Sequence, residues 1–335
     1  MIQRRAGWVA GLAGALLLAP ASHAGTLGTD VIGLFPQNVG EFAYADMKAA
    51  RQYKWFPLLE DQMLPSRFRQ FERFLTAAGI DTQTQVEELA WGAMPASKDQ
   101  PEEVLGVALG AFQPDSTEAY LKQEKLPTRT THGYTLYAFG SGSSPADIFF
   151  FFLDSNTAVF GQGDAIDKLL AVRFGGAPSL LANTAMFPLI DGQNGQGMIW
   201  AVLDQHYTQL GLGQMMPEME SAGASAPALY QKVRAMILSV DTTSDVQTKI
   251  EAVCASPDDA NNLAALLQAG LLYKKYQASQ APPAANGNAN PNAGLAAVLD
   301  RAQVVPRGDR LDLDFRLTED QIVSLIQQRV FAVNM

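Results

Sequence analysis

Residues 147–161 read DIFFFFLDSNTAVFG, and the IFFFF run within them is apolar at every position. Successive side chains of a β-strand point to opposite faces of the sheet. The two faces would then carry Phe149 and Phe151, and Ile148, Phe150 and Phe152. A half-buried strand alternates apolar with polar residues, and this strand does not. Both faces of the sheet must therefore be covered here, because an exposed apolar strand promotes aggregation.

Three covers for the second face are open. They are the second half of the chain, helices between Phe56 and Ala78, and an external ligand or partner. Most apolar strands are core strands, which favours one of the two internal covers. On the alternative interpretation, Ile148, Phe150 and Phe152 form an apolar binding face.

The N-terminus has the three parts of an export signal. Arg4 and Arg5 supply the charged region, the stretch 8–18 is apolar, and Ser22-His23-Ala24 predicts cleavage before Gly25. The apolar stretch is too short to span a bilayer. We therefore expect a periplasmic or extracellular protein that is not an integral membrane protein.

The mature chain is acidic and has one cysteine. Losing Arg4 and Arg5 leaves 22 of the 24 basic residues against 34 acidic ones, a net charge of −12. This charge argues against nucleic acid as a partner. A single cysteine, Cys254, excludes an internal disulfide and fits a buried apolar position. Stability must then come from a packed core.

The order of expected elements predicts an α+β fold, mostly antiparallel sheet with helices packed on one face. We divide the chain into a signal peptide (1–24), a first α+β unit (25–195) and a second unit (196–335). Residues 279–293, rich in Ala, Asn and Pro, are expected to form a flexible loop in the second unit.

The two units are predicted to share one topology over 39–174 and 197–331. QPDSTEAYLKQ at 113 resembles SPDDANNLAALLQ at 256, and AIDKLLAVRF at 165 resembles QIVSLIQQRV at 321. Ser256 and Thr318 are expected to cap helices, the latter with Gln321 in a capping box. The segments AGID…VEELAWGAM…EEVLGVALGAF, in this order, resemble those of exported bacterial α+β repeat proteins of unknown function. That resemblance implies the fold and an envelope location, and it transfers no catalytic residue.

The candidate chemistry is sparse. Asp312 and Asp314 share a strand face and could form an acid/base or cation site, but Arg310 and Arg316 lie on the same face. Strict alternation there is typical of a solvated sheet face. GQG at 161–163 lacks the third glycine of a dinucleotide motif, and GSGSS at 140–144 is predicted to connect strands.

One further cluster has metal-binding residue types. It comprises Met215, Met216 and Met219, with His206 nearby; thioethers suit Cu(I), but methionine is more often a filler of apolar surfaces. We therefore assign no catalytic, cofactor or metal residues. The expected function is a non-catalytic binding or scaffold protein of the bacterial envelope, whose partner is an envelope protein or an apolar small molecule. The alternatives are a carrier of lipid-like molecules and a hydrolase with a dispersed acidic site.

Overall fold

The computed structural model describes residues 25–63, 66–95, 102–215, 230–242, 245–280 and 301–327. The strands are β1 (Glu41–Asp46), β2 (Val86–Met94), β3 (Glu103–Gly110), β4 (Thr128–Thr131), β5 (Tyr134–Phe139), β6 (Ile148–Phe152), β7 (Thr157–Gln162), β8 (Ile199–Leu203), β9 (Val233–Asp241), β10 (Val246–Cys254), β11 (Gln303–Arg307) and β12 (Arg310–Leu317). The helices are α1 (Thr29–Ile32), α2 (Met47–Ala50), α3 (Phe56–Met63), α4 (Ser66–Ala77), α5 (Thr82–Gln85), α6 (Pro114–Gln123), α7 (Gly163–Arg173), α8 (Phe187–Gln193), α9 (Gln205–Met215), α11 (Pro257–Gln280) and α13 (Glu319–Gln327), with a 3-10 turn η1 (Leu180–Ala182).

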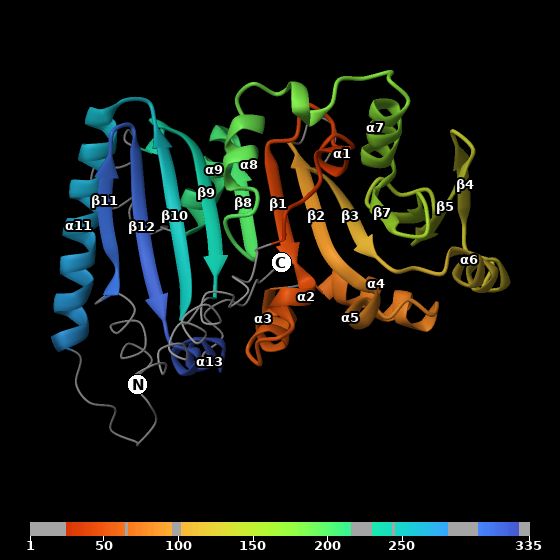
Figure 1. Ribbon diagram of the computed structural model, residues 1–335, viewed down its shortest axis with the longest axis horizontal. Helices are drawn as coiled ribbons and strands as arrows, with labels where there is room; N and C mark the ends of the chain where they lie inside the picture. Colours follow the sequence, from red (N-terminus) through yellow and green to blue (C-terminus); the bar gives the residue numbers. More distant parts are fainter. Residues whose placement is uncertain are drawn as a thin grey trace, which may run out of the picture.

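The described strands form one sheet in the order β11-β12-β10-β9-β8-β1-β2-β3-β7-β6-β5-β4 (Figure 1). Every neighbouring pair is antiparallel. The α+β class with a mostly antiparallel sheet is therefore confirmed. In the described part of the chain, no helix combines the length and apolar character needed to cross a membrane.

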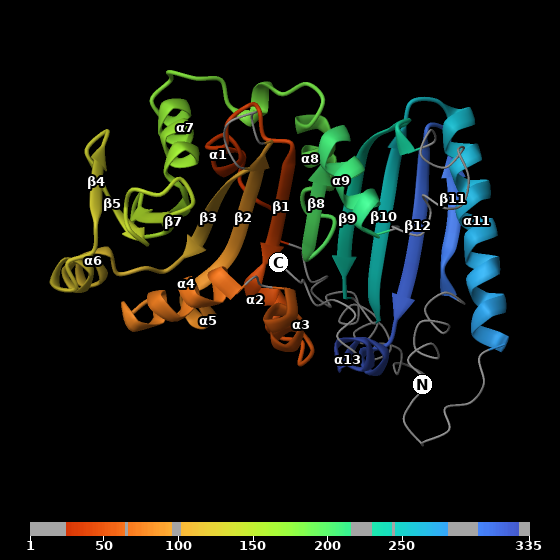
Figure 2. The ribbon, with the colours of Figure 1, turned by 180° about the vertical axis from the view of Figure 1, so that it is seen from behind.

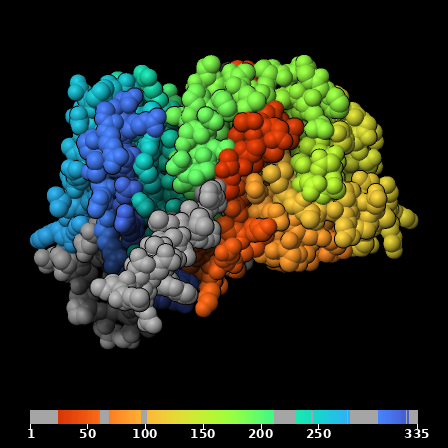
Figure 3. Space-filling model, viewed as in Figure 1, coloured from red at the N-terminus to blue at the C-terminus, as the bar shows by residue number. Residues whose placement is uncertain are grey.

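The two halves of the chain meet at the antiparallel pair β1–β8. Outward from β1 the order is β2, β3, β7, β6, and outward from β8 it is β9, β10, β12, β11. The first series continues into the hairpin β5–β4, which has no counterpart among the described strands of the second. The halves lie side by side in the space-filling view (Figure 3). They share one uninterrupted sheet, so the division into units at residue 195 stays a prediction.

Helices cover both faces of the sheet, which corrects the expectation of one covered face. Phe42 and Tyr44 of β1 pack in a core with side chains of α1, α7 and α8. Ala45, on the opposite face of the same strand, belongs to a core that includes side chains of α2, α3, α4, α6 and α13. The physical reason is the one visible in IFFFF: first-half strands such as β3 and β6 are apolar on both sides, and each side needs a cover.

The two helices compared in the sequence lie on opposite faces. Ile166, Leu169 and Leu170 of α7 are buried in the core with Phe42, whereas Ile322 and Ile326 of α13 are buried in the core with Ala45. Their similar apolar stripes therefore reflect amphipathic helices in general rather than equivalent packing.

Both expected helix caps are formed. The Asp259 backbone N–H donates to Ser256 Oγ at 3.2 Å. Around Thr318, its own N–H donates to Gln321 Oε1 at 3.0 Å, and the Gln321 N–H donates to Thr318 Oγ1 at 3.3 Å, a complete capping box. Helix α11 runs along the edge strand β11 (Figure 2). It extends through Gln280, so the first two residues of the expected loop 279–293 are helical. The rest of that loop and the predicted signal peptide lie outside the described residues.

Candidate functional site

All five residues of IFFFF are buried in β6, between β5 and β7. Phe149 and Phe151 belong to the core that contains α7. Ile148, Phe150 and Phe152 face the other core, where Phe71 and Leu75 of α4 and Leu121 of α6 are also buried. The chain's own helices thus cover the second face, and the segment between Phe56 and Ala78 supplies much of the cover.

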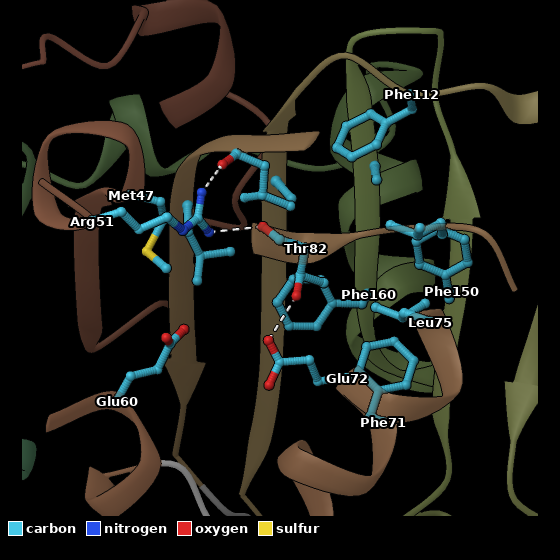
Figure 4. Close-up of a pocket in the computed structure, with 15 residues that line it drawn as sticks. Met47, Arg51, Glu60, Phe71, Glu72, Leu75, Thr82, Phe112, Phe150 and Phe160 are labelled. Carbon is cyan, nitrogen blue, oxygen red and sulfur yellow. Dashed lines mark hydrogen bonds between the residues drawn. The ribbon is translucent and has the colours of Figure 1, made fainter. Parts of the chain in front are cut away.

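This cover is incomplete, because a cavity of about 130 Å³ remains between α4 and the sheet. Phe150 lines it; Ile148 and Phe152 do not. Figure 4 shows the side chains around it. The lining residues come from α2 to α5, the adjoining turns and four strands: Met47, Arg51, Glu60, Phe71, Glu72, Leu75, Ile80, Thr82, Val86, Leu89, Ala108, Phe112, Phe150, Ala158 and Phe160.

Nearly all of the surface that faces the cavity is apolar, and charged side chains border it on one side, which we call its polar end. The rings of Phe71, Phe112, Phe150 and Phe160 gather with Leu75 on one side in Figure 4, and Arg51, Glu60 and Met47 lie on the other. Phe71 is the centre of the aromatic group. Its ring centroid lies 6.4 Å from that of Phe150 and 6.0 Å from that of Phe160. Both separations lie in the range in which aromatic rings attract one another.

Hydrogen bonds to the backbone hold the polar end in place. Arg51 Nη1 donates to the Val86 carbonyl at 2.6 Å, and Nη2 donates to the Thr82 carbonyl at 2.7 Å. Thr82 Oγ1 in turn donates to Glu72 Oε1 at 2.6 Å. The Gln83 amide reaches Glu72 at 3.3 Å and Glu60 at 3.5 Å, so both carboxylates lie around one side chain.

The electrostatics of this end reflect its partial burial. Burial, and then repulsion from Glu72, raise the pKa of the Glu60 carboxyl above its ordinary value. Burial lowers the pKa of the Arg51 guanidinium, while Glu60, Glu72 and Asp81 act in the opposite direction. Among the charged side chains that line the cavity, two are carboxylates and one is a guanidinium.

The predicted acidic pair lies far along the sheet, on β12. Asp312 is buried, with ion pairs to Lys249 at 3.3 Å and to Arg307 at 3.4 Å. Asp314 is half-buried and lies directly opposite Lys249 on β10. The structure therefore places both carboxylates on a face that supplies its own cations, and no lining residue of the cavity comes from it.

Glu251 completes this charged cluster. It forms an ion pair with Lys249 at 2.9 Å and a short ion pair with Arg310. Burial acts to raise the pKa of Glu251, but the bonds from Lys249 and Arg310 outweigh burial and hold that pKa below its ordinary value. The cluster has the geometry of a structural ion-pair network.

Neither His132 nor His206 joins these carboxylates. His132 lies in the turn between β4 and β5, at the other end of the sheet, and stacks on Phe174 at 5.0 Å. His206 packs edge-on against Tyr207. Among the residues with described placement, no group of three or more His, Cys, Asp or Glu side chains is arranged to hold a metal ion.

The remaining sequence candidates have structural positions. Cys254 is buried, and burial raises the pKa of its thiol to about 11. The GSGSS segment connects β5 to β6, where Asp147 accepts hydrogen bonds from Ser141 and Ser144. GQG spans the junction of β7 and α7. Met215 ends α9, and Met216 and Met219 lie outside the described residues.

Three comparisons with known proteins complete the description. No family model matches the chain, and no curated protein matches it. Among solved structures, a chain described as crystal form I of TP0453 superposes with a TM-score of 0.46 and 12% sequence identity. The superposition covers 89% of this chain and 96% of that one.

Proposed function

We propose that this protein binds a small apolar molecule, or the apolar end of a larger one, in the cavity beneath α4. The observation that carries the proposal is an unfilled space of about 130 Å³ with aromatic and aliphatic walls. Protein interiors are close-packed, and an apolar cavity of roughly 150 Å³ is enough to hold benzene. A six-carbon ring or chain matches the space here.

The architecture around the cavity supports reversible binding. The sheet strands β2, β3, β6 and β7 form a continuous floor, and α4 with the flanking turns forms the roof. Such an arrangement, apolar walls with a few polar groups at one end, is typical of small-molecule sites. On this account the protein is a carrier or sensor, and the ligand leaves chemically unchanged.

A second candidate rests on Glu60 and Glu72. Two carboxylates near one another, one with a raised pKa, form the arrangement that general acid/base catalysis uses. Incubation with hexyl acetate separates the two candidates. The binding proposal expects the ester to be recovered intact, whereas hydrolysis that is lost in Glu60→Gln would favour the enzyme.

Thermal melting with 1-hexanol tests the binding proposal. A ligand that binds only the folded state raises the melting temperature, and at ten times its dissociation constant it adds about 1.4 kcal/mol. Ala108→Leu places a larger side chain in the cavity and should abolish this rise. Ala77→Leu makes the same change at an exposed position of α4 and should preserve it. Equal rises in both variants would contradict binding in the cavity.

We also propose that binding takes place outside the cytoplasm, in the periplasm or medium. The support is the three-part signal in residues 1–24. N-terminal sequencing of the protein from its own host should begin at Gly25. A chain that still begins at Met1 in the envelope fraction would contradict this location.

A further inference from the structure

The polar end of the cavity carries more negative than positive charge. Glu60 and Glu72 line it together with Arg51, and Asp81 also acts on Arg51. Both terminal nitrogens of the guanidinium donate to backbone carbonyls, whereas its buried Nε has no hydrogen-bond partner among the described residues. An incoming anion would have to approach two carboxylates and compete for a cation that is held against the wall.

From this charge balance we infer that the site selects apolar ligands with a cationic or neutral polar end, and discriminates against carboxylates such as fatty acids. The inference rests on the proposed binding function and names the chemical class of the ligand. An alkylammonium would place its chain against Phe71, Phe150 and Phe160 and its charged end near Glu60 and Glu72. In Figure 4, Glu60 lies on the far side of the cavity from these rings, whereas Glu72 lies between Glu60 and the rings of Phe71 and Phe160.

Partial burial strengthens the discrimination. Charges interact more strongly where water is partly excluded, and salt screens them less. The raised pKa of Glu60 is a consequence of the same environment, because burial and Glu72 both oppose its negative charge. A ligand ammonium would relieve that repulsion, whereas a ligand carboxylate would add to it.

Neutral ligands that can donate a hydrogen bond should bind with intermediate affinity. An alcohol can donate its hydroxyl proton to a carboxylate without adding charge. The expected order of affinity is therefore hexylamine, then 1-hexanol, then hexanoate. Across the two charged ligands the expected ratio is roughly tenfold or more.

The test measures dissociation constants of these three ligands at neutral pH by the shift in melting temperature or by titration followed by NMR. Glu72→Gln and Glu60→Gln should each reduce the preference for the ammonium, and Gln keeps an acceptor for Thr82 and its neighbours. Asp191→Asn provides the control, because it removes one negative charge from the exposed surface of α8, in a helix of the opposite face. It should leave the order and the ratio unchanged.

The possible results distinguish a failure of the charge preference from a failure of the proposed binding function. Hexanoate binding as tightly as hexylamine would overturn the inference and leave the proposed function standing. The expected order, unaltered in both Glu variants, would overturn the assignment to Glu60 and Glu72. If none of the three ligands binds, the proposed function itself fails.

Discussion

The Phe160 ring lies over the backbone of Gly106, its direct partner across the β3–β7 pair. A Cβ at Gly106 would overlap this ring. The absence of a side chain at Gly106 therefore leaves room for the Phe160 ring, which forms one wall of the cavity. Gly106→Ala should push the Phe160 side chain into the cavity. We expect a loss of roughly 1–3 kcal/mol from overpacking, together with weaker binding of 1-hexanol.

Urea unfolding and the 1-hexanol titration measure both effects. Gly270→Ala is the matched control, since nothing lies within 4 Å of the position where its Cβ would be. In an exposed helix interior that change should stabilise the protein by about 0.5–1 kcal/mol. A Gly106→Ala protein as stable as the wild type, with unchanged hexanol affinity, would refute this role of the glycine.

Phe150 is the residue that belongs both to the core and to the cavity. It is 4% exposed and packs against Phe152 at 4.9 Å as well as against Phe71. Phe150→Ala should cost roughly 3–5 kcal/mol in urea or thermal unfolding. Phe150→Asp should fail to fold, because the chain's own helices cover this face. Phe174→Asp, at a position 55% exposed, should fold normally. A folded Phe150→Asp protein would show that α4 does not close over the sheet.

Much of the fold could be predicted from the sequence, because apolar periodicity and capping residues are local. The strand at 310–317 and the helix starts at Ser256 and Thr318 are examples. The edge strand β4 was missed because Thr128–Thr131 contains no apolar side chain; pairing with β5 and the ion pair from Arg129 to Asp167 hold it. Helix α8 was missed because Pro188 and Gly192 lie within seven residues and mask its helical pattern.

The cavity could not be predicted, because it depends on strand order. β7 inserts between β3 and β6, and this brings Ala108, Phe160 and Phe150 next to one another. The sequence did contain one signal, the IFFFF strand that is apolar on both faces, and this strand supplies Phe150 to one wall of the cavity. The chemistry of Asp312 and Asp314 depended on cross-strand partners: Lys249 on β10 and Arg307 on β11 neutralise Asp312.

Glu60 should lower the stability of the protein at neutral pH. Its pKa is raised in the folded state by burial and by Glu72, so the folded protein holds its proton to a higher pH than the unfolded chain does. Ionisation at pH 7 is therefore unfavourable in the fold, and Glu60→Gln should raise the melting temperature there. The advantage should shrink as the pH falls and Glu60 becomes protonated. A variant that is less stable than the wild type at pH 7 would contradict the assigned burial.

Glu251 should have the opposite pH dependence. The pKa of the Glu251 carboxyl in the folded state lies below the ordinary value of 4.5. The ionised carboxylate therefore stabilises the folded protein above that pH, and this stabilisation is lost as the pH falls through the folded-state pKa. Glu251→Gln should cost roughly 1–3 kcal/mol at pH 7, since it removes charge-assisted bonds to Lys249 and Arg310. The cost should decrease in unfolding curves recorded below pH 4.5. A cost that does not change with pH would show that ionisation of this carboxylate does not matter.

A crystal structure of the wild-type protein soaked with 6-bromohexan-1-ol tests the central claim most directly. The anomalous signal of bromine locates the apolar end of the ligand without reference to any assumed pose. We predict a peak among the rings of Phe71, Phe150 and Phe160, with the hydroxyl toward Glu72, and no such peak in Ala108→Leu crystals. Bromine bound only elsewhere on the protein, with the space beneath α4 closed by side chains, would contradict the claim that this cavity binds an apolar ligand.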